Sequence, residues 1–231
     1  MQVIILAGGL GTRLPEYTKL IPKPMVKVKG IPIIQHIIKH YIKYGFNDFL
    51  IATGYKGKVI KHYFQNNKIK GSKIKVINTG LKTLTGGRLK RLEKYIKSTF
   101  FLTYGDGVSN VNLKRLLKFH NKNKKTVTVT AVKPMARFGE LKIKKNIVTS
   151  FKEKPQTSVG WINGGFFVME KKFLISIKGD KTILEKEPLE KVSKKRQLVA
   201  YKHSGFWYCM DTKRDKDVLE KLLKKKDKFN E

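Results

Sequence analysis

The chain has 231 residues, of which 40% are hydrophobic, so it is long enough to bury a core, and we expect one domain that spans residues 1–231. Its apolar runs all fall short of the roughly 18 residues that a membrane-spanning helix needs, and its first residues lack the basic segment of a signal peptide. A single cysteine, Cys209, excludes an internal disulfide framework and fits a reducing compartment, so we expect a cytoplasmic protein without a membrane partner.

Charge is the most unusual feature of the composition. Lys and Arg number 51 against 17 Asp and Glu, which gives a formal net charge of +34. Such a chain attracts polyanions, so a basic nucleic-acid-binding protein is one hypothesis. Only seven of the cations are arginine, whose planar fork reads bases and phosphates, and the lysines are spread along the whole chain. This distribution favours a solvated, lysine-rich surface over a specific nucleic-acid site.

Apolar runs bounded by turn residues alternate along the chain with segments of helical period. The predicted strands are 2–6, 48–53, 73–78, 99–104, 126–133, 147–152, 163–170 and 198–203. The predicted helices are 31–44, 56–65, 87–97, 111–121, 183–193 and 214–225, and Asn110 is expected to cap the helix that starts at Val111. The early strand–helix alternation predicts an α/β protein with a mostly parallel sheet flanked by helices, and the crowded later strands predict a small antiparallel addition. Ligands of such sheets bind beyond the carboxyl ends of the strands, here after 2–6 and 99–104.

A glycine-rich loop follows the first predicted strand. Three of the four residues 8–11 are glycine, so backbone N–H groups there can close around phosphate oxygens, and Thr12 adds a hydroxyl donor. Arg13 offers a planar fork for a polyphosphate. Lys23 lies between two prolines on a stiff segment, which suits the placement of one point charge. A tight strand-to-helix turn would also need glycines, but the added Thr-Arg and Pro-Lys-Pro residues favour a phosphate site.

Acidic residues are scarce, which draws attention to Asp106. It follows the apolar run 99–104 and lies between two glycines. Because Mg²⁺ is typically held by one or two carboxylates plus substrate phosphates, Asp106 is a candidate ligand, with an ordinary turn aspartate as the alternative. Asp211 follows a second apolar run, 206–210, whereas Asp215 and Asp217 fall on a charged helix and are expected to be solvated.

Two further segments carry weaker local signals. Glu153 and Lys154 end a predicted strand, where a surface turn explains them equally well. Asn163 and Gly164 offer an amide and open backbone to sugar hydroxyls, but a bulge in a core strand would have the same composition.

Several of these motifs together resemble a known family. LAGGLGTRL at residues 6–14, followed by PKPM at 22–25, is similar to the signature of nucleotide-sugar pyrophosphorylases. Four later segments resemble the glucose-1-phosphate cytidylyltransferase branch of that family: TGGRLKR at 85–91, YGDGVS at 104–109, WINGGFF at 161–167 and GFW at 205–207. The similarity runs from residue 1 to about residue 220.

The resemblance implies a Rossmann-like α/β fold, Mg²⁺, and transfer of a nucleotidyl group to a sugar 1-phosphate with release of pyrophosphate. CTP and glucose 1-phosphate are the favoured substrates; another nucleoside triphosphate or another phosphorylated acceptor stays open, and a homo-oligomer is expected. The residue roles that it implies are nucleotide binding by Leu6, Ala7, Gly8, Gly9, Gly11, Thr12, Gly86, Arg88 and Gly105; catalysis by Arg13 and Lys23; sugar-phosphate binding by Glu153, Lys154, Asn163 and Gly164; and metal binding by Asp106 and Asp211.

Overall fold

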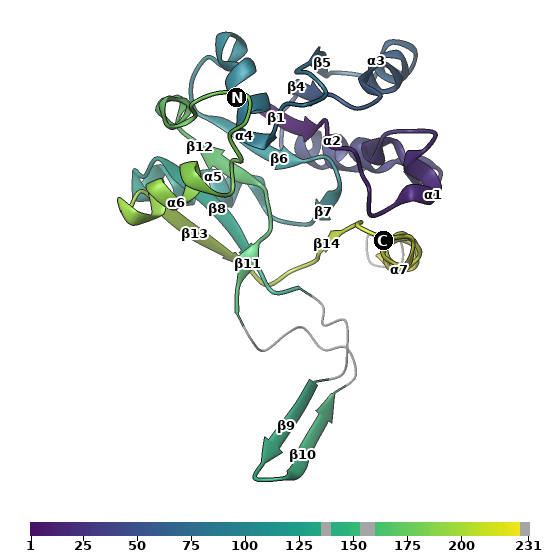
Figure 1. Cartoon of the computed structure of the whole chain (residues 1–231), viewed down its shortest axis with the longest axis vertical. Coiled ribbons are helices and arrows are strands. Elements are labelled where there is room, and N and C mark those ends of the chain that lie inside the picture. Colours follow the sequence, from purple (N-terminus) through teal and green to yellow (C-terminus); the bar gives the residue numbers. More distant parts are fainter. Residues whose placement is uncertain (135–139, 153–159, 227–231) are drawn as a thin grey trace.

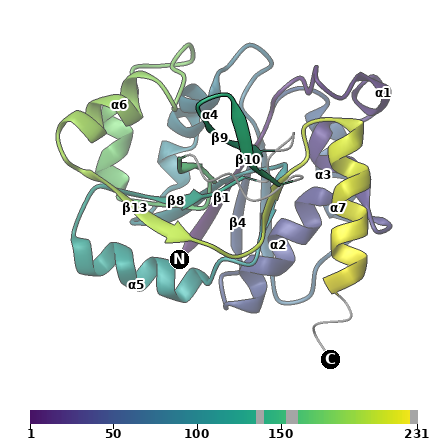
Figure 2. The ribbon, with the colours of Figure 1, turned by 90° about the horizontal axis from the view of Figure 1, so that it is seen from below.

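The computed structural model describes residues 1–134, 140–152 and 160–226, and its centre is a sheet with helices on both faces (Figures 1 and 2). Along the sheet the hydrogen-bonded order is β11-β8-β12-β6-β1-β4-β5, and β13 also pairs with β8. The strands are β1 (Gln2–Ala7), β4 (Asp48–Thr53), β5 (Lys73–Asn78), β6 (Phe100–Tyr104), β8 (Val127–Val132), β11 (Ile162–Asn163), β12 (Phe167–Met169) and β13 (Leu198–His203).

The pairing directions confirm the expected mixed sheet. β1 runs parallel to β4 and to β6, β4 runs parallel to β5, and β8 runs parallel to β13. β11 and β12 are antiparallel to β8, and β12 is also antiparallel to β6. The parallel part is therefore continuous around β1, and the antiparallel strands join it beside β6.

Three two-stranded sheets complete the strands that the structure describes. They are β2 (Lys27–Val28) with β3 (Ile31–Pro32), β7 (Gly107–Ser109) with β14 (Trp207–Cys209), and β9 (Glu140–Lys144) with β10 (Ile147–Lys152). Of these six strands the sequence predicts β10 alone. β2, β3, β7 and β14 have two or three residues each, so they lack the length over which alternation can be recognised, whereas β9 has five residues and was missed.

The side chains of each strand alternate between the two faces of the sheet, and each face is covered by a different set of helices. In β1, Val3 and Ile5 belong to one buried cluster and Ile4 to the other. The first cluster includes apolar residues of α2 (Ile33–Lys43), α3 (Gly57–Asn66), α5 (Leu113–Asn123) and α7 (Lys213–Lys226), and the second includes those of α4 (Thr85–Arg91) and α6 (Glu187–Lys194). Figure 2 shows α4 and α6 on the side opposite α2, α5 and α7. The remaining helices are α1 (Pro15–Thr18) and the 3-10 helices Lys23–Met25, Glu93–Tyr95 and Lys171–Ser176.

Several predicted boundaries were wrong for identifiable reasons. The predicted strand 163–170 is two strands, because the backbone between them includes Gly165 and Phe166 at φ angles of +72° and +45°. Helix α5 begins at Leu113, and its cap is Asn112, whose side chain accepts a hydrogen bond from the Arg115 N–H at 2.9 Å. Asn110, the predicted cap, instead donates its backbone N–H to the carbonyl of Phe206. Among the described residues, every helix is too short or too polar to span a membrane.

Candidate active site

The carboxyl ends of β1 and β6 approach closely at one edge of the sheet. The Gly105 N–H, just past β6, donates to the Leu6 carbonyl at 3.0 Å. A Cβ at Gly105 would lie 3.1 Å from that oxygen and 3.0 Å from Pro24 Cγ, so glycine permits the approach. Gly11 has a φ of +68°, and its Cβ would lie 2.7 Å from Thr18 Cγ2. The loop after β1 therefore needs glycine for its own conformation, whatever it binds.

The same edge opens into a cavity of about 560 Å³, lined by the glycine-rich loop, the start of α4 and the residues after β6. Fourteen of the predicted site residues line it: Leu6, Ala7, Gly8, Gly9, Gly11, Thr12, Arg13, Lys23, Arg88, Gly105, Asp106, Asn163, Gly164 and Asp211. They come from segments as far apart in sequence as β1 and the residues just after β14, so the fold brings together motifs that are distant in the chain.

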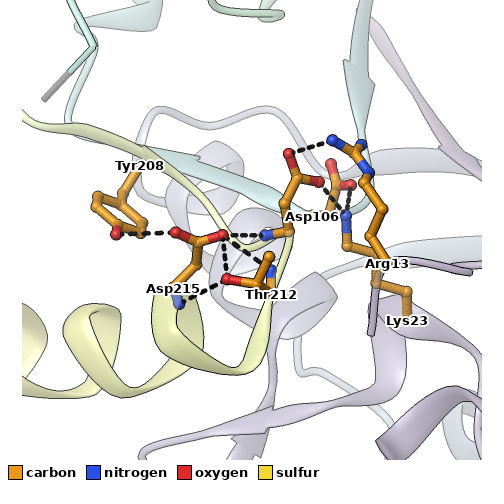
Figure 3. A network of polar contacts seen from close by, with 7 residues as sticks. Arg13, Lys23, Asp106, Tyr208, Thr212 and Asp215 are labelled. Atoms are coloured by element: carbon orange, nitrogen blue, oxygen red, sulfur yellow. Dashed lines mark hydrogen bonds and ion pairs between the residues drawn. The ribbon is translucent and has the colours of Figure 1, made fainter. Parts of the chain in front are cut away.

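A lysine bridges two carboxylates at the centre of the site (Figure 3). The Nζ atom of Lys23 lies 2.6 Å from Asp106 Oδ2 and 2.6 Å from Asp211 Oδ1. Burial lowers the pKa of Lys23, but the charge and hydrogen bond of Asp106 and the hydrogen bond of Asp211 outweigh it, so its net pKa is raised and the ammonium stays charged. Arg13 adds a second cation, with Nη1 2.8 Å from Asp211 Oδ2.

The two carboxylates meet because β7 and β14 pair. Trp207, Tyr208 and Cys209 lie opposite Ser109, Val108 and Gly107 in an antiparallel register. The N–H of Met210 then donates to the carbonyl of Asp106 at 3.0 Å. Two acids separated by 105 positions are thereby fixed side by side. Sequence reasoning found both acids but missed the strands that join them.

Asp215 was interpreted from the sequence as a solvated helix residue, and that interpretation is wrong. Its Oδ2 atom accepts hydrogen bonds from the Asp211 N–H at 3.1 Å, the Thr212 N–H at 2.8 Å and the Thr212 hydroxyl at 2.9 Å. Its Oδ1 atom accepts from the Tyr208 hydroxyl at 3.3 Å. Asp217 is exposed, as expected.

Glu185 is a second polar residue that sequence reasoning missed. Its two carboxylate oxygens accept hydrogen bonds from two residues of the cavity wall, the Tyr104 hydroxyl at 2.6 Å and the Thr85 hydroxyl at 2.7 Å. Burial and the Glu185 charge both raise the pKa of Tyr104, so that hydroxyl keeps its proton. The Asn163 amide donates to the same hydroxyl at 3.3 Å. In sequence, Glu185 stands within a lysine- and glutamate-rich segment that gives no signal for it.

Arg88 and Gly86 were both predicted to bind the nucleotide. Arg88 lines the cavity, but its guanidinium donates to the backbone carbonyls of Gly8 at 2.8 Å and of Gly80 at 2.7 Å, so it also ties the glycine-rich loop in place. Gly86 lies behind the wall in α4, where its N–H donates to the Thr182 carbonyl at 3.0 Å. A Cβ there would lie 2.9 Å from the same oxygen.

The predicted sugar-phosphate residues divide into two groups. Glu153 and Lys154 lie outside the described residues. Asn163 and Gly164 lie at the break between β11 and β12, where the Asn163 side chain accepts from the Gly165 N–H at 2.9 Å. The Gly164 carbonyl accepts from the Trp207 indole N–H at 2.7 Å. Between β11 and β12 the pairing with β8 shifts by two residues, from Asn163 opposite Ala131 to Val168 opposite Thr128, and both predicted residues line the cavity.

The acidic cluster has the donor set of a site for a hard divalent cation. One ligand atom from each of Asp106, Cys209 and Asp211 lies within 4.8 Å of the others. Burial and the two neighbouring carboxylates raise the pKa of the Cys209 thiol, so it stays neutral and is a poor ligand for a hard ion. The Lys23 ammonium already lies between the two carboxylates, so their oxygens face a shared point where a positive charge is held. These residues fit such an ion through oxygen donors.

Comparison with known proteins agrees with this geometry. A family model described as nucleotidyl transferase matches residues 2–221. A curated glucose-1-phosphate cytidylyltransferase of Salmonella typhimurium is 43% identical, covering 97% of this chain and 96% of the relative. A probable glucose-1-phosphate cytidylyltransferase of Bacillus subtilis is 39% identical, covering 95% and 94%.

A solved structure shows a similar fold. The crystal structure of HddC from Yersinia pseudotuberculosis complexed with GMP-PN has a TM-score of 0.78 and 26% identity to this chain, covering 96% of it and 99% of the HddC chain. Because the family model spans residues 2–221 and both relatives align along almost their full length, the protein is an enzyme that belongs to the nucleotidyl transferase family.

Proposed function

We propose that the protein transfers the cytidylyl group of CTP to glucose 1-phosphate and releases pyrophosphate. Two relatives named for this activity, 43% and 39% identical along nearly the whole chain, support the substrate pair. The observation that carries the proposal is the group of Lys23, Asp106 and Asp211 beside the glycine-rich loop. A fixed ammonium, a carboxylate pair and open backbone in one cavity suit chemistry between phosphates.

In the proposed reaction, an oxygen of the sugar 1-phosphate attacks the α-phosphorus of the triphosphate. A bond forms between that oxygen and the α-phosphorus, and the bond from the α-phosphorus to the oxygen shared with the β-phosphorus breaks. Pyrophosphate leaves with that electron pair. The attacking phosphate is already an anion near neutral pH, because the second pKa of a phosphate monoester is about 6. A general base is therefore unnecessary, and the task is to hold two polyanions together.

Arg13 and Lys23 supply the positive charge for that task. Arg13 has five donors and uses Nη1 for Asp211, so it keeps donors for phosphate oxygens. Lys23 is buried and charged, which strengthens its attraction to an anion in the cavity. The loop residues Gly8, Gly9 and Thr12 border the same space and would present backbone N–H groups to the triphosphate.

Mg²⁺ is the cofactor that the donor set favours, with Asp106 and Asp211 as its protein ligands. When bound, such an ion neutralises charge on the transferring and leaving phosphates. The sugar is assigned to the side of Asn163 and Gly164, where an amide and a broken strand face the cavity. The single cysteine fits a cytoplasmic location. A homo-oligomer is proposed from the family resemblance alone.

A substrate panel tests the proposal. Four nucleoside triphosphates are crossed with glucose, galactose and mannose 1-phosphates, with and without Mg²⁺, and released pyrophosphate is measured. We expect the highest kcat/KM for CTP with glucose 1-phosphate, and turnover only with the metal. Faster turnover with GTP, UTP or dTTP would replace the nucleotide assignment. Absence of pyrophosphate from every pair, together with salt-sensitive binding to nucleic acid in a gel-shift titration, would favour the basic binding protein instead.

A further inference from the structure

Asp215 holds the backbone from which the Asp211 carboxylate projects. Asp211 lies between β14 and α7, outside both elements. Its N–H and that of Thr212 both point at Asp215 Oδ2, at 3.1 Å and 2.8 Å. The Thr212 hydroxyl in turn accepts from the Asp215 N–H at 3.2 Å. The contact is therefore reciprocal, as in a capping box at the start of a helix.

The second oxygen of Asp215 links the same turn to the strand before it. Oδ1 accepts a hydrogen bond from the Tyr208 hydroxyl at 3.3 Å, and Tyr208 belongs to β14, which pairs with β7 directly after Asp106 (Figure 3). Asp215 thus joins the strand, the turn and the helix that surround Asp211. A side chain at this junction restricts the rotation of the Asp211 backbone, and with it the direction of the carboxylate.

We infer that Asp215 is a positioning residue for the divalent cation, acting through Asp211, an inference that rests on the metal site of the proposed function. Residues that orient metal ligands typically change metal affinity by about 10–100-fold when they are substituted. Asp215 lies outside the group of possible ligand atoms, which among the described residues comes from Asp106, Cys209 and Asp211. The Asp215 carboxylate lies next to Asp211, so it could affect cation binding through its charge as well as through its hydrogen bonds. The variants must therefore separate these two effects.

The competing explanation is that Asp215 only caps α7. Loss of a cap costs about 0.5–2 kcal/mol of stability, but it leaves the ion affinity of the folded protein unchanged. Metal affinity measured on folded protein therefore distinguishes a positioning residue from a structural cap, whereas a melting temperature alone does not.

The experiment measures binding of Mn²⁺ alone to the full chain, by the loss of the free-ion EPR signal, at a temperature where each variant is folded by circular dichroism. Asp215→Ala removes the four hydrogen bonds that the carboxylate accepts. Tyr208→Phe removes the hydrogen bond to Oδ1 without changing charge, and Asp215→Asn keeps an acceptor oxygen but not the charge. Asp217→Asn is the matched control, because it removes the same charge from an exposed position two residues farther along α7. Asp106→Asn reports on the metal site itself.

We expect Asp215→Ala to weaken Mn²⁺ binding about 10-fold or more, Asp215→Asn and Tyr208→Phe to weaken it less, and Asp217→Asn to leave it within about 2-fold of the wild type. The Mn²⁺ concentration for half-maximal turnover should rise in the same order. If Asp215→Ala binds Mn²⁺ like the wild type while Asp106→Asn does not, the inference is wrong and the metal site stands. If Asp217→Asn weakens binding as much as Asp215→Ala, charge rather than position is responsible, and the inference is again wrong. Failure of wild-type protein to bind Mn²⁺, or normal binding by Asp106→Asn, overturns the metal site and this inference together.

Discussion

Lys23 is the residue that links the two acidic side chains of the site. Its ammonium contacts the two carboxylates that we propose as metal ligands, so in the free protein it competes with a divalent cation for the same oxygens. Its neighbours in the Pro-Lys-Pro segment are buried, which fixes the start of the side chain. The same residue is thus a counter-ion before substrates bind and a phosphate ligand in the proposed reaction.

Lys23→Met should therefore have opposite effects on binding and on turnover. We expect Mn²⁺ to bind more tightly in the absence of substrates, because the internal cation is gone, and kcat to fall by about 10²–10³-fold. EPR titration and pyrophosphate release measure the two effects. Lys27→Met, which removes an exposed charge four residues away, should change neither. Weaker Mn²⁺ binding by Lys23→Met, or unchanged turnover, would contradict the dual role.

At the residue scale, motifs identified the charged residues but not the residues that orient them. Arg13, Lys23, Asp106 and Asp211 each follow a recognisable local pattern. Glu185 does not, because its partner Tyr104 lies 81 positions away. Asp215 stands three residues after Thr212, in the spacing of a capping box, and the interpretation as a solvated residue overlooked that local pattern. A carboxylate in a charged stretch looks solvated until such partners are known.

Among the secondary-structure elements, α4 depends on glycines for packing rather than for flexibility. A Cβ at Gly87 would lie 2.5 Å from both the Cα and the carbonyl oxygen of Asp180, which are backbone atoms that cannot simply rotate away. The helix places Thr85 and Arg88 at the cavity wall. The TGGR segment therefore sets how closely α4 approaches the 179–182 turn, and through it the position of that wall.

Gly87→Ala tests this packing. Alanine is the better helix former, by about 1 kcal/mol, yet we expect the free energy of unfolding to fall by about 1–3 kcal/mol because the methyl group overlaps the backbone of Asp180. Chemical denaturation provides the measurement. Gly179→Ala is the matched control: a Cβ there meets no atom within 4 Å, and its stability should stay within about 0.5 kcal/mol of the wild type. A stabilised Gly87→Ala would show that the turn is free to move.

Element prediction succeeded where the pattern is local. β1 and β4 are buried apolar runs, and both were placed to within a residue. The predicted strand 163–170 failed because positive φ angles at Gly165 and Phe166 break it, and an unbroken apolar run does not reveal that. β7 and β14 have three residues each and form through pairing over about a hundred positions, which periodicity cannot detect.

For the molecule as a whole, the net charge of +34 opposes compactness. Like charges on a folded surface repel more strongly than on an expanded chain, so part of the folding free energy is lost to this repulsion. Ion pairs offset it only locally. The pairs Arg91–Asp180 and Lys178–Glu187 have both partners exposed to solvent, and such pairs contribute little to stability.

Salt should therefore stabilise the protein. We expect the Tm to rise as NaCl increases from about 0.01 M to about 1 M, because the screening length falls from about 30 Å to about 3 Å. Differential scanning fluorimetry gives the Tm at each concentration. Below about 0.1 M, NaCl and NaSCN should act alike if screening is responsible, since ion-specific effects need higher concentrations. A Tm that is flat or falls over this lower range would show that the repulsion is negligible.

The sequence by itself determined the class of fold and the chemistry of the site, because apolar alternation fixes which side chains are buried and the glycine-rich, Pro-Lys-Pro and aspartate motifs are contiguous in the chain. Only the tertiary structure decided that Lys23 bridges Asp106 and Asp211, that Glu185 accepts the hydrogen bond of Tyr104, and that Arg88 ties the glycine-rich loop in place. The physical reason is range. Burial and turns depend on neighbours in sequence, whereas a hydrogen bond across 80 to 188 positions forms only once the folded sheet has brought the two residues together.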